Sequence, residues 1–347
     1  MTKTVSDIGE IRLIDEILLP GVSGGSKGDD CAFLSVGEQE LLWSMDPCPT
    51  PVAAMLDCCT PEVWGHYTAT INLSDIAACG GTPLGMLVSL EMPDDTELSF
   101  INGFQSGLLR ALQRSGAKLL GGNVKSANRF NATGTAIGIV GDRHVTRHIN
   151  SDDTRLYIVG ECGNFWAAVV GQYANWLGDE EDTRSQLLPA LLDPAPQTSA
   201  GKVIGSLPFE IACMDCSDGV GSAVQQLANA NSMDIVLEEA PQWAIKSSAK
   251  TTLEHHGYRI ENACYQFGDW QLACLVAASD AAKFEKAMLD TPLTLLGRGR
   301  SGAGNVERAD GKRLAAQVMN KNFAGGYNSI SSIEALLDRF MERLVFV

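Results

Sequence analysis

The chain has 347 residues, 45% of them hydrophobic, and a formal net charge of −16. This length predicts about two domains, and the negative charge argues against a general nucleic-acid binder or a protein of anionic membrane surfaces. No apolar run reaches the ~18 residues of a membrane span, and the polar N-terminus does not resemble a signal peptide. We therefore expect a cytoplasmic protein without a membrane segment.

The spacing of apolar residues in the first half predicts a mixed α/β domain over residues 1–150. Gly121, Gly122 and Asn123 are expected to form a turn after a short strand. The glycines of the last strand indicate that another element packs closely against its backbone. Helices are expected at 8–19, 61–79 and 97–114, and strands at 31–34, 40–45, 84–90, 118–120 and 133–140.

The second half, residues 151–347, is predicted to form a second α/β domain with its own mixed sheet. A mainly helical stretch, interrupted by a solvated acidic loop at 178–182, precedes a break at 193–196. Further helices are expected at 199–207, from 220 onward, at 280–288 and at 331–346, with strands at 155–159, 211–214, 234–237, 271–277 and 293–296.

The ten cysteines are scattered along the chain, and several lie in apolar runs. In a chain without a secretory signal they are expected to be reduced, buried thiols. Cys213 and Cys216 form one Cys-x-x-Cys pair, but a zinc site needs a second pair, and a redox motif is expected at a helix start rather than in a strand. A structural role is favoured for both.

The segment around Asp215 combines a strand, an acidic turn and a helix. Asp215 and Asp218 follow the strand at 211–214, Ser217 lies between them, and Gly219 allows a tight path into the helix. Ser217 or Asp218 is a plausible N-cap. A carboxylate pair at a strand end suits Mg²⁺, and a helix N-terminus offers N–H groups to a phosphate. Taken alone, the segment somewhat favours a capped helix with two solvated aspartates, because strand–Asp–Gly–helix turns are common.

Further aspartates lie at the ends of other predicted elements. Asp30 directly precedes the strand at 31–34, and Asp46 ends the strand at 40–45, so two adjacent strands each carry a carboxylate at one end. Asp75 lies within the helix at 61–79. These positions extend the hypothesis of a metal and phosphate site beyond the segment around Asp215.

Six sequence pieces, in the order GDDCAFL, SMD, NLSDIAACGGTP, LLGGN, MDCSDG and GDWQL, resemble those of thiamine-monophosphate kinases. These enzymes belong to the PurM-like superfamily, which includes aminoimidazole ribonucleotide synthetase. The resemblance covers roughly residues 8–327. It implies a fold of two α/β domains whose N-terminal domains pair in a homodimer. It also implies ATP as a substrate, with its phosphates and several Mg²⁺ ions in the cleft between the domains.

The resemblance carries functional roles over to individual residues of this chain. Asp46 and Asp218 are also expected to act in catalysis, and in-line phosphoryl transfer needs mainly positioning and charge neutralisation. The metal-binding positions are Asp30, Asp46, Asp75, Asp215 and Asp218, and the nucleotide contacts are Gly121, Gly122, Asn123, Arg147 and Ser217.

Several positions depart from the family pattern. Asn123 replaces an aspartate that serves a metal, so it keeps an oxygen ligand but loses the charge. A substrate-contacting histidine of the family aligns near Ala53, and a substrate-binding glutamate aligns with Gly268. A family tryptophan has no counterpart around residues 324–327. The nucleotide half of the site is thus mostly kept, whereas the acceptor half is mostly changed.

Three functions follow as hypotheses. The first is an ATP- and Mg²⁺-dependent phosphotransferase whose acceptor is thiamine monophosphate or a different small molecule. The second is a PurM-type synthetase that activates an amide or carboxylate oxygen. The third is a non-catalytic nucleotide-binding homologue. Product analysis separates a stable phosphorylated acceptor from a cyclised or dehydrated product with free phosphate, and both from absence of turnover.

Overall fold

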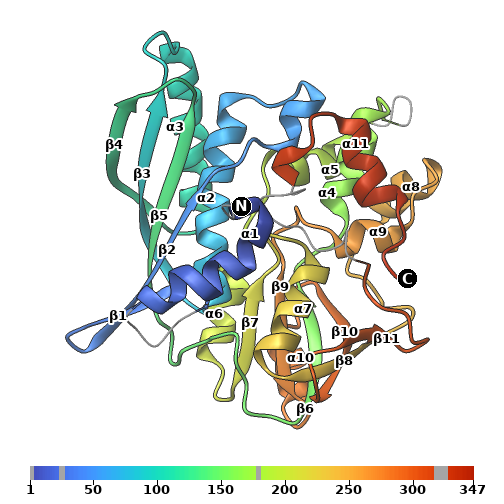
Figure 1. Ribbon diagram of the computed structural model, residues 1–347. Coiled ribbons are helices and arrows are strands. Elements are labelled where there is room, and N and C mark those ends of the chain that lie inside the picture. The colour runs from blue at the N-terminus through green and yellow to red at the C-terminus, as the bar shows by residue number, and fades with distance from the viewer. Residues whose placement is uncertain (1–3, 23–27, 177–180, 316–326) are drawn as a thin grey trace.

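The computed structural model describes residues 4–22, 28–176, 181–315 and 327–347. In these residues the chain forms a mixed α/β structure around a five-stranded and a six-stranded sheet, as Figure 1 shows. The expected fold class of α/β structure with mixed sheets is confirmed. Among the described helices, none is both long and apolar enough to cross a membrane.

The five-stranded sheet belongs to the first half of the chain and has the order β1-β2-β5-β3-β4. Only the β3–β4 pair is parallel. Two helices cover one face of this sheet, and the other face stays open (Figure 1). The elements are β1 (Ala32–Val36), β2 (Gln39–Pro47), α2 (Pro61–Ala78), β3 (Thr82–Met92), α3 (Leu98–Arg114), β4 (Lys118–Ser126) and β5 (Asn131–Ile139).

Glycines let the layers of this half approach one another closely. A Cβ atom on Gly65 of α2 would lie 1.9 Å from the Phe104 carbonyl oxygen of α3, so the two helices cross in direct contact. A Cβ atom on Gly134 of β5 would lie 2.3 Å from Asn72 Nδ2 of α2. The predicted close approach of another element to this strand is therefore confirmed, and that element is α2.

The six-stranded sheet of the second half has the order β11-β8-β10-β6-β9-β7. Its strands are β6 (Asp153–Val159), β7 (Ile211–Asp215), β8 (Met233–Leu237), β9 (Leu272–Ala277), β10 (Leu293–Ser301) and β11 (Val306–Arg308). The helices are α4 (Asn164–Tyr173), α5 (Glu181–Leu192), α6 (Thr198–Ser206), α7 (Val220–Ala230), α8 (Ser247–His255), α9 (Ile260–Tyr265) and α10 (Ala281–Ala287).

Helix α2 lies between the two halves of the chain. Its buried residues run almost continuously from Val63 to Ala78, because α3 and the first sheet pack on one side while β7 and α6 pack on the other. At its C-terminal end the contact with α6 is again made by backbone. A Cβ atom on Gly205 would lie 1.9 Å from the carbonyl oxygen of Gly80.

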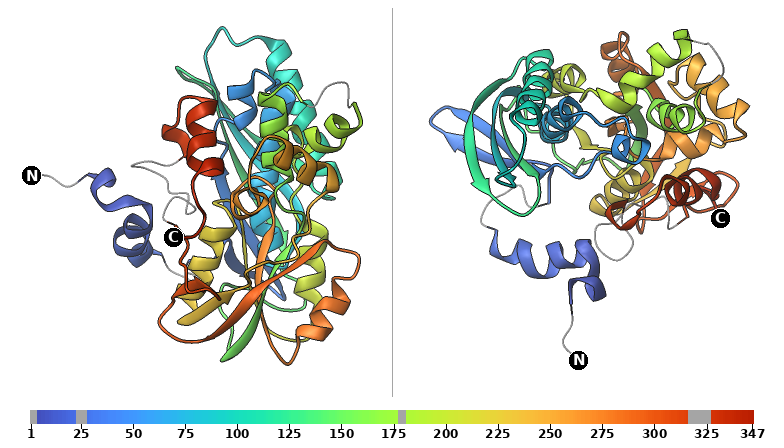
Figure 2. Two further views of the ribbon diagram at one scale, coloured as in Figure 1. Left: turned by 90° about the vertical axis from the view of Figure 1, so that its right-hand side faces the viewer. Right: turned by 90° about the horizontal axis from the view of Figure 1, so that it is seen from above.

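The two ends of the chain differ from the predicted helices. The first helix, α1 (Val5–Leu13), is kinked at Gly9 and continues as a short π-helix, Ile14–Leu18. Figure 2 shows this segment standing apart from the body of the molecule. The C-terminal helix predicted at 331–346 is longer than the observed one. The observed helix comprises α11 (Ile333–Leu337) and the π-helix Asp338–Glu342, after which Phe346 pairs with Leu314 in a β-bridge.

Two local predictions around the expected site are wrong. Gly121, Gly122 and Asn123 do not form a turn, because they lie inside β4 and pair with β3 across a bulge. Neither Ser217 nor Asp218 caps α7. The N-cap is Gly219, whose φ of 97° only glycine adopts readily.

Candidate metal centre

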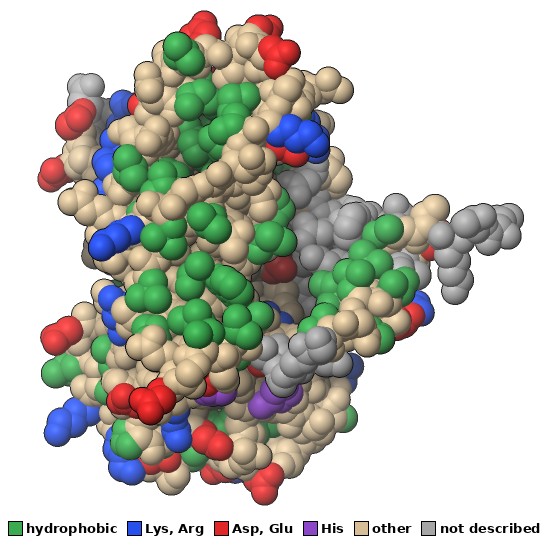
Figure 3. Space-filling model, turned by 90° about the vertical axis from the view of Figure 1, so that its left-hand side faces the viewer, with side chains coloured by type: hydrophobic (Ala, Val, Ile, Leu, Met, Phe, Trp, Pro, Cys, Tyr) green, Lys and Arg blue, Asp and Glu red, His purple; other side chains and the backbone are tan. Residues whose placement is uncertain are grey.

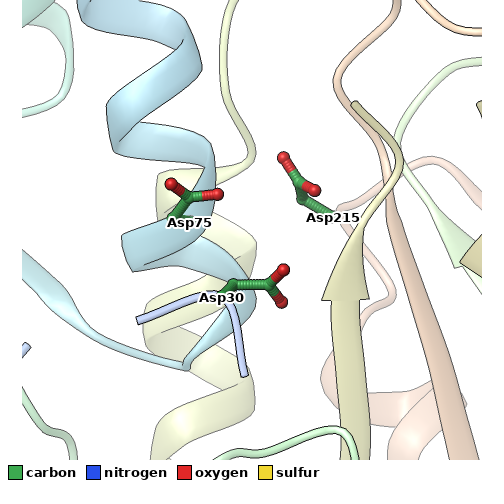
Figure 4. Close-up of side chains that lie close together, drawn as sticks. All are labelled: Asp30, Asp75 and Asp215. Carbon is green, nitrogen blue, oxygen red and sulfur yellow. The ribbon is translucent and has the colours of Figure 1, made fainter. Parts of the chain in front are cut away.

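Three buried carboxylates from distant parts of the sequence meet at one point. Asp30 precedes β1, Asp75 lies on α2 and Asp215 ends β7, and Figure 4 shows their side chains converging. One carboxylate oxygen of each residue lies within 4.8 Å of one carboxylate oxygen of both others. Asp75 is 8% exposed and Asp215 is 3% exposed. Such a dry oxygen-only cluster has the donor chemistry of a Mg²⁺ site.

The proton affinities of these groups reflect their crowding. Burial raises the pKa of Asp75 well above its ordinary value, and the neighbouring carboxylates Asp215, Asp46 and Asp30 add to the effect. Burial and the charge of Asp30 raise the pKa of Asp215 to about 7, although a hydrogen bond from Ser217 opposes the rise. A bound divalent cation would relieve both the desolvation and the repulsion of these carboxylates.

Asp46 lies beside the three-carboxylate cluster and is held by α2. Its backbone N–H donates to Asn72 Oδ1 at 3.0 Å, and Asn72 Nδ2 donates to the Asp46 carbonyl at 3.3 Å. The Asp46 side chain contributes to the raised pKa of Asp75. The sequence prediction did not include Asn72, although its place three residues before Asp75, on the same side of a helix, could have suggested it.

The turn after β7 contributes less directly to the cluster. The Ser217 hydroxyl donates to Asp215 Oδ1 at 2.8 Å, so it orients that carboxylate. Asp218 is half-buried in the same turn but is not one of the three clustered carboxylates. The predicted roles of Ser217 as a nucleotide contact and of Asp218 as a metal ligand and catalytic residue stay predictions.

Arg147 joins the cluster from the loop between β5 and β6. Its Nη2 lies 2.5 Å from Asp30 Oδ1, and the two side chains are 22% and 4% exposed. Burial lowers the pKa of the guanidinium, but the Asp30 carboxylate outweighs this and the net pKa is raised. The residue expected to contact a nucleotide is therefore paired with an expected metal ligand.

Gly121, Gly122 and Asn123 lie away from the carboxylates of the same chain. Asp46 pairs with Gly134, which pairs with Val88, which in turn pairs with Gly122. Three strand spacings correspond to roughly 14 Å. Within one chain, the predicted nucleotide cradle on β4 is thus separated from the cluster by the width of the sheet.

The loop before β9 contains one functional candidate that the sequence prediction missed, Asp269, beside Gly268, which aligns with the substrate-binding glutamate of the family. Asp269 Oδ1 accepts a hydrogen bond from the N–H of Phe165, at the start of α4, at 2.8 Å. Burial raises the pKa of Asp269 to about 7 against the effect of that bond. Trp270 has a φ of 53°, unusual for a bulky side chain, and its buried Nε1 has no hydrogen-bond partner. Gly268 has a φ of 119°, and a Cβ atom there would lie 2.2 Å from the Phe165 ring.

Residues 28–140 match the family model described as AIR synthase related protein, N-terminal domain. The thiamine-monophosphate kinase of Synechococcus elongatus is 28% identical over 291 residues, which cover 79% of this chain and 84% of that protein. The thiamine-monophosphate kinase of Aquifex aeolicus is 27% identical over 275 residues, which cover 77% of this chain and 86% of that protein.

Solved structures share the fold over almost the whole chain. The structure described as AaThiL complexed with AMPPCP and TMP gives a TM-score of 0.80 at 24% identity and covers 93% of this chain and 100% of that chain. The hydrogenase maturation protein HypE in complex with ATP gives a TM-score of 0.59 at 16% identity, covering 88% of this chain and 91% of that chain. The chain is thus similar in sequence to thiamine-monophosphate kinases over most of its length and shares the fold of the AaThiL structure, and its residues 28–140 match the AIR synthase related N-terminal domain.

Proposed function

We propose that this chain is an ATP- and Mg²⁺-dependent kinase that transfers a phosphoryl group to thiamine monophosphate or to a different small-molecule acceptor. The observation that carries the proposal is the convergence of Asp30, Asp75 and Asp215, in a chain whose relatives are thiamine-monophosphate kinases. AMPPCP is an ATP analogue, and its presence with TMP in the similar AaThiL structure supports this pair of substrates. The synthetase alternative has no comparable support.

The carboxylates fit the metal that such a reaction needs. Asp30 Oδ2 and Asp215 Oδ2 are buried without a hydrogen-bond partner, which leaves lone pairs for a hard cation. Bound Mg²⁺ would neutralise charge on the phosphates during transfer. The chain itself holds Asp215 in place through Ser217 and holds the backbone of Asp46 through Asn72. We propose that Asp46 and Asp218 are further metal ligands and that both also act in catalysis of the phosphoryl transfer.

The residues of the acceptor half support weaker binding of thiamine monophosphate by this chain than by its relatives. Ala53 is fully buried where the family has a histidine. Gly268 has a positive φ, which disfavours any residue with a side chain, and the Phe165 ring leaves no space for the glutamate that the family has at this position. Each lost polar contact typically contributes about 1 kcal/mol, and more when it is charged. We therefore propose that thiamine monophosphate is turned over slowly or that a different acceptor is preferred.

A coupled ADP-release assay tests the activity, with mass spectrometry to identify the product. Thiamine monophosphate is compared with a panel of small alcohols, phosphates and carboxylates. A stable phosphorylated product supports the kinase, whereas free phosphate with a dehydrated product would support the synthetase. Turnover of thiamine monophosphate at the ordinary kinase rate of about 1–100 per second would refute the weaker fit.

Metal dependence is tested by calorimetry of ATP binding in Mg²⁺ and in EDTA. Asp75→Asn removes one charge of the cluster and is expected to weaken Mg²⁺-dependent binding by more than tenfold. Asp142→Asn, at an exposed loop position, is the matched control. Equal ATP affinity in Mg²⁺ and EDTA would contradict the proposed role of the carboxylates.

We also propose that two copies pair through the open face of the first sheet. Figure 3 shows this face with hydrophobic side chains gathered over its middle. Apolar surface of this extent on an otherwise charged protein marks a protein interface. The proposal keeps the division into an N-terminal ATP- and metal-binding, dimer-forming domain at 1–150 and a C-terminal domain at 151–347. The exposed side chains include Leu34, Trp43, Met45, Leu84, Leu87 and Leu120.

A further inference from the structure

The loop that carries Arg147 is fixed through its backbone. The Arg147 N–H donates to Asp29 Oδ1 at 2.8 Å, and its carbonyl accepts from Asn231 Nδ2 at 2.8 Å. The preceding carbonyl, of Thr146, accepts from the N–H of Cys213 on β7 at 2.8 Å. The Cα atom of Arg147 is thus held from both halves of the chain, and only its long side chain is free to take another position.

The side chain of Arg147 is less completely held than its backbone. Besides the pair with Asp30, Nη1 donates to Gln226 Oε1 at 3.3 Å, whereas Nε is buried without a partner. A guanidinium has five N–H donors arranged to bind an oxyanion in bidentate fashion. The contacts in this structure therefore use only part of what Arg147 can donate.

Asp30 Oδ1 accepts this arginine contact while Asp30 also belongs to the three-carboxylate cluster. A divalent cation bound by the cluster can take Asp30 Oδ2, which is buried without a partner, while the guanidinium of Arg147 holds Oδ1. Two cations at one carboxylate repel each other. Binding of the metal therefore weakens the pair between Arg147 and Asp30. A released guanidinium, tethered at a fixed Cα atom, remains close to the metal and to any phosphate that the metal holds.

We propose that Arg147 and the metal ion exchange places at Asp30. The guanidinium neutralises Asp30 until a divalent cation takes over that carboxylate, and it then pairs with a phosphate of the incoming nucleotide. Arg147 is thus a positioning residue that opposes metal binding alone and favours binding of metal together with nucleotide. The second half of this inference rests on the proposed function, whereas the first half concerns the metal alone.

The test measures two affinities on the full-length chain by calorimetry, with Mn²⁺ alone and with ATP at saturating Mg²⁺. For Arg147→Met, we expect Mn²⁺ to bind on the order of tenfold more tightly, since a competing cation is removed. ATP should bind on the order of tenfold more weakly, since a phosphate contact is lost. Arg147→Lys keeps the charge without the bidentate geometry, so Mn²⁺ affinity should stay near that of the unaltered chain while ATP affinity falls.

Arg298→Met is the matched control, because it removes one positive charge from an exposed position on β10. Both affinities should stay within twofold of the unaltered chain. Weakening of both affinities in Arg147→Met would indicate a merely structural arginine and would overturn the exchange, as would no change in Mn²⁺ affinity. Failure of the unaltered chain to bind ATP at all would instead refute the proposed function and leave the Mn²⁺ comparison to decide the first half. If Arg147→Met does not fold, the Arg147→Lys pair of affinities decides, and equal ATP affinity there overturns the proposal.

Discussion

His66 of α2 is buried with its Nδ1 atom 2.6 Å from Asp193 Oδ1, in the connection between α5 and α6. Its other ring nitrogen, Nε2, lies 2.9 Å from the carbonyl oxygen of Pro194. Both ring nitrogens therefore lie close to oxygen atoms of the segment that connects α5 and α6. The helix that carries Asp75 is in this way tied to the second half of the chain through a buried imidazole.

Replacing this imidazole should destabilise the chain. In His66→Leu the Asp193 carboxylate keeps only its pair with Arg114, and the free energy of unfolding should fall by about 2 kcal/mol. Arg114→Leu is the control, because Arg114 is 53% exposed and such pairs contribute less than about 1 kcal/mol. Urea denaturation of the two variants checks this, and equal losses would show that the buried imidazole has no special role.

Asp269 should give the chain a measurable pH dependence of stability. Its pKa in the folded chain is about 7, above the ~3.9 of an unfolded aspartate, so the folded state holds an extra proton between these values. Binding of this proton to Asp269 stabilises the folded chain. The stabilisation is fully present at about pH 4 and below, is lost as pH rises through 7, and has an upper limit of about 4 kcal/mol in the free energy of unfolding.

The variant Asp269→Asn removes this titration while it keeps an oxygen acceptor for the Phe165 N–H. The free energy of unfolding of the unaltered chain, minus that of the variant, should therefore fall between pH 5 and pH 8. Urea denaturation across this range measures the difference, with Asp142→Asn as an exposed aspartate for comparison. A difference that is constant or rises with pH would contradict the raised pKa.

The backbone contact between α6 and the turn after α2 predicts intolerance of even one methyl group. The Cβ atom of Gly205→Ala would lie 1.9 Å from the Gly80 carbonyl oxygen, so the backbone must shift. We expect a loss of at least about 1–3 kcal/mol in the free energy of unfolding. The control is Gly21→Ala, where no atom lies within 4 Å of the added methyl group, and thermal unfolding of both variants should show a clear loss only for position 205.

The proposed pairing of two copies is tested at the open sheet face. Met45 is 68% exposed on β2, and Met45→Lys would place a charge within the apolar patch at little cost to the separate chain. The unaltered chain should scatter light as a dimer at micromolar concentration, and the variant as a monomer. Leu98→Lys provides the control, since Leu98 is 80% exposed at the start of α3, outside the sheet. A monomeric unaltered chain would contradict the pairing.

Most helices and strands could be predicted because their apolar spacing is regular. The turn predicted at Gly121 and Gly122 failed because glycine has little preference for strands, whereas pairing with β3, about thirty residues earlier, fixes them there. The C-terminal helix was predicted too long because Val345 and Phe346 are apolar residues at helical spacing. Both are buried, but they lie beyond Arg343, where the backbone becomes extended. In both cases contacts remote in sequence override the local pattern.

The candidate site was less accessible to sequence reasoning than the fold. No local pattern brings Asp30, Asp75 and Asp215 together, because each lies on a different element. Their common role was predicted from the family resemblance, and the structure places them within one cluster. The link between Arg147 and Asp30 depends on the path of a long loop, and the backbone of Trp270 is set by its neighbours rather than by its own preference.

The burial of α2 on all sides has a consequence for how the chain unfolds. A helix that buries Thr68, Thr70 and Asn72 together with its apolar residues has no single face that one sheet could cover alone. Removal of the second half would leave the Thr70 hydroxyl without the Pro194 carbonyl to which it donates and the flank of α2 without its packing partners, at a cost larger than the margin by which small domains are stable. The chain should therefore melt in one cooperative transition, and residues 1–150 made alone should not reach a native state, even though the sheets belong to separate stretches of sequence.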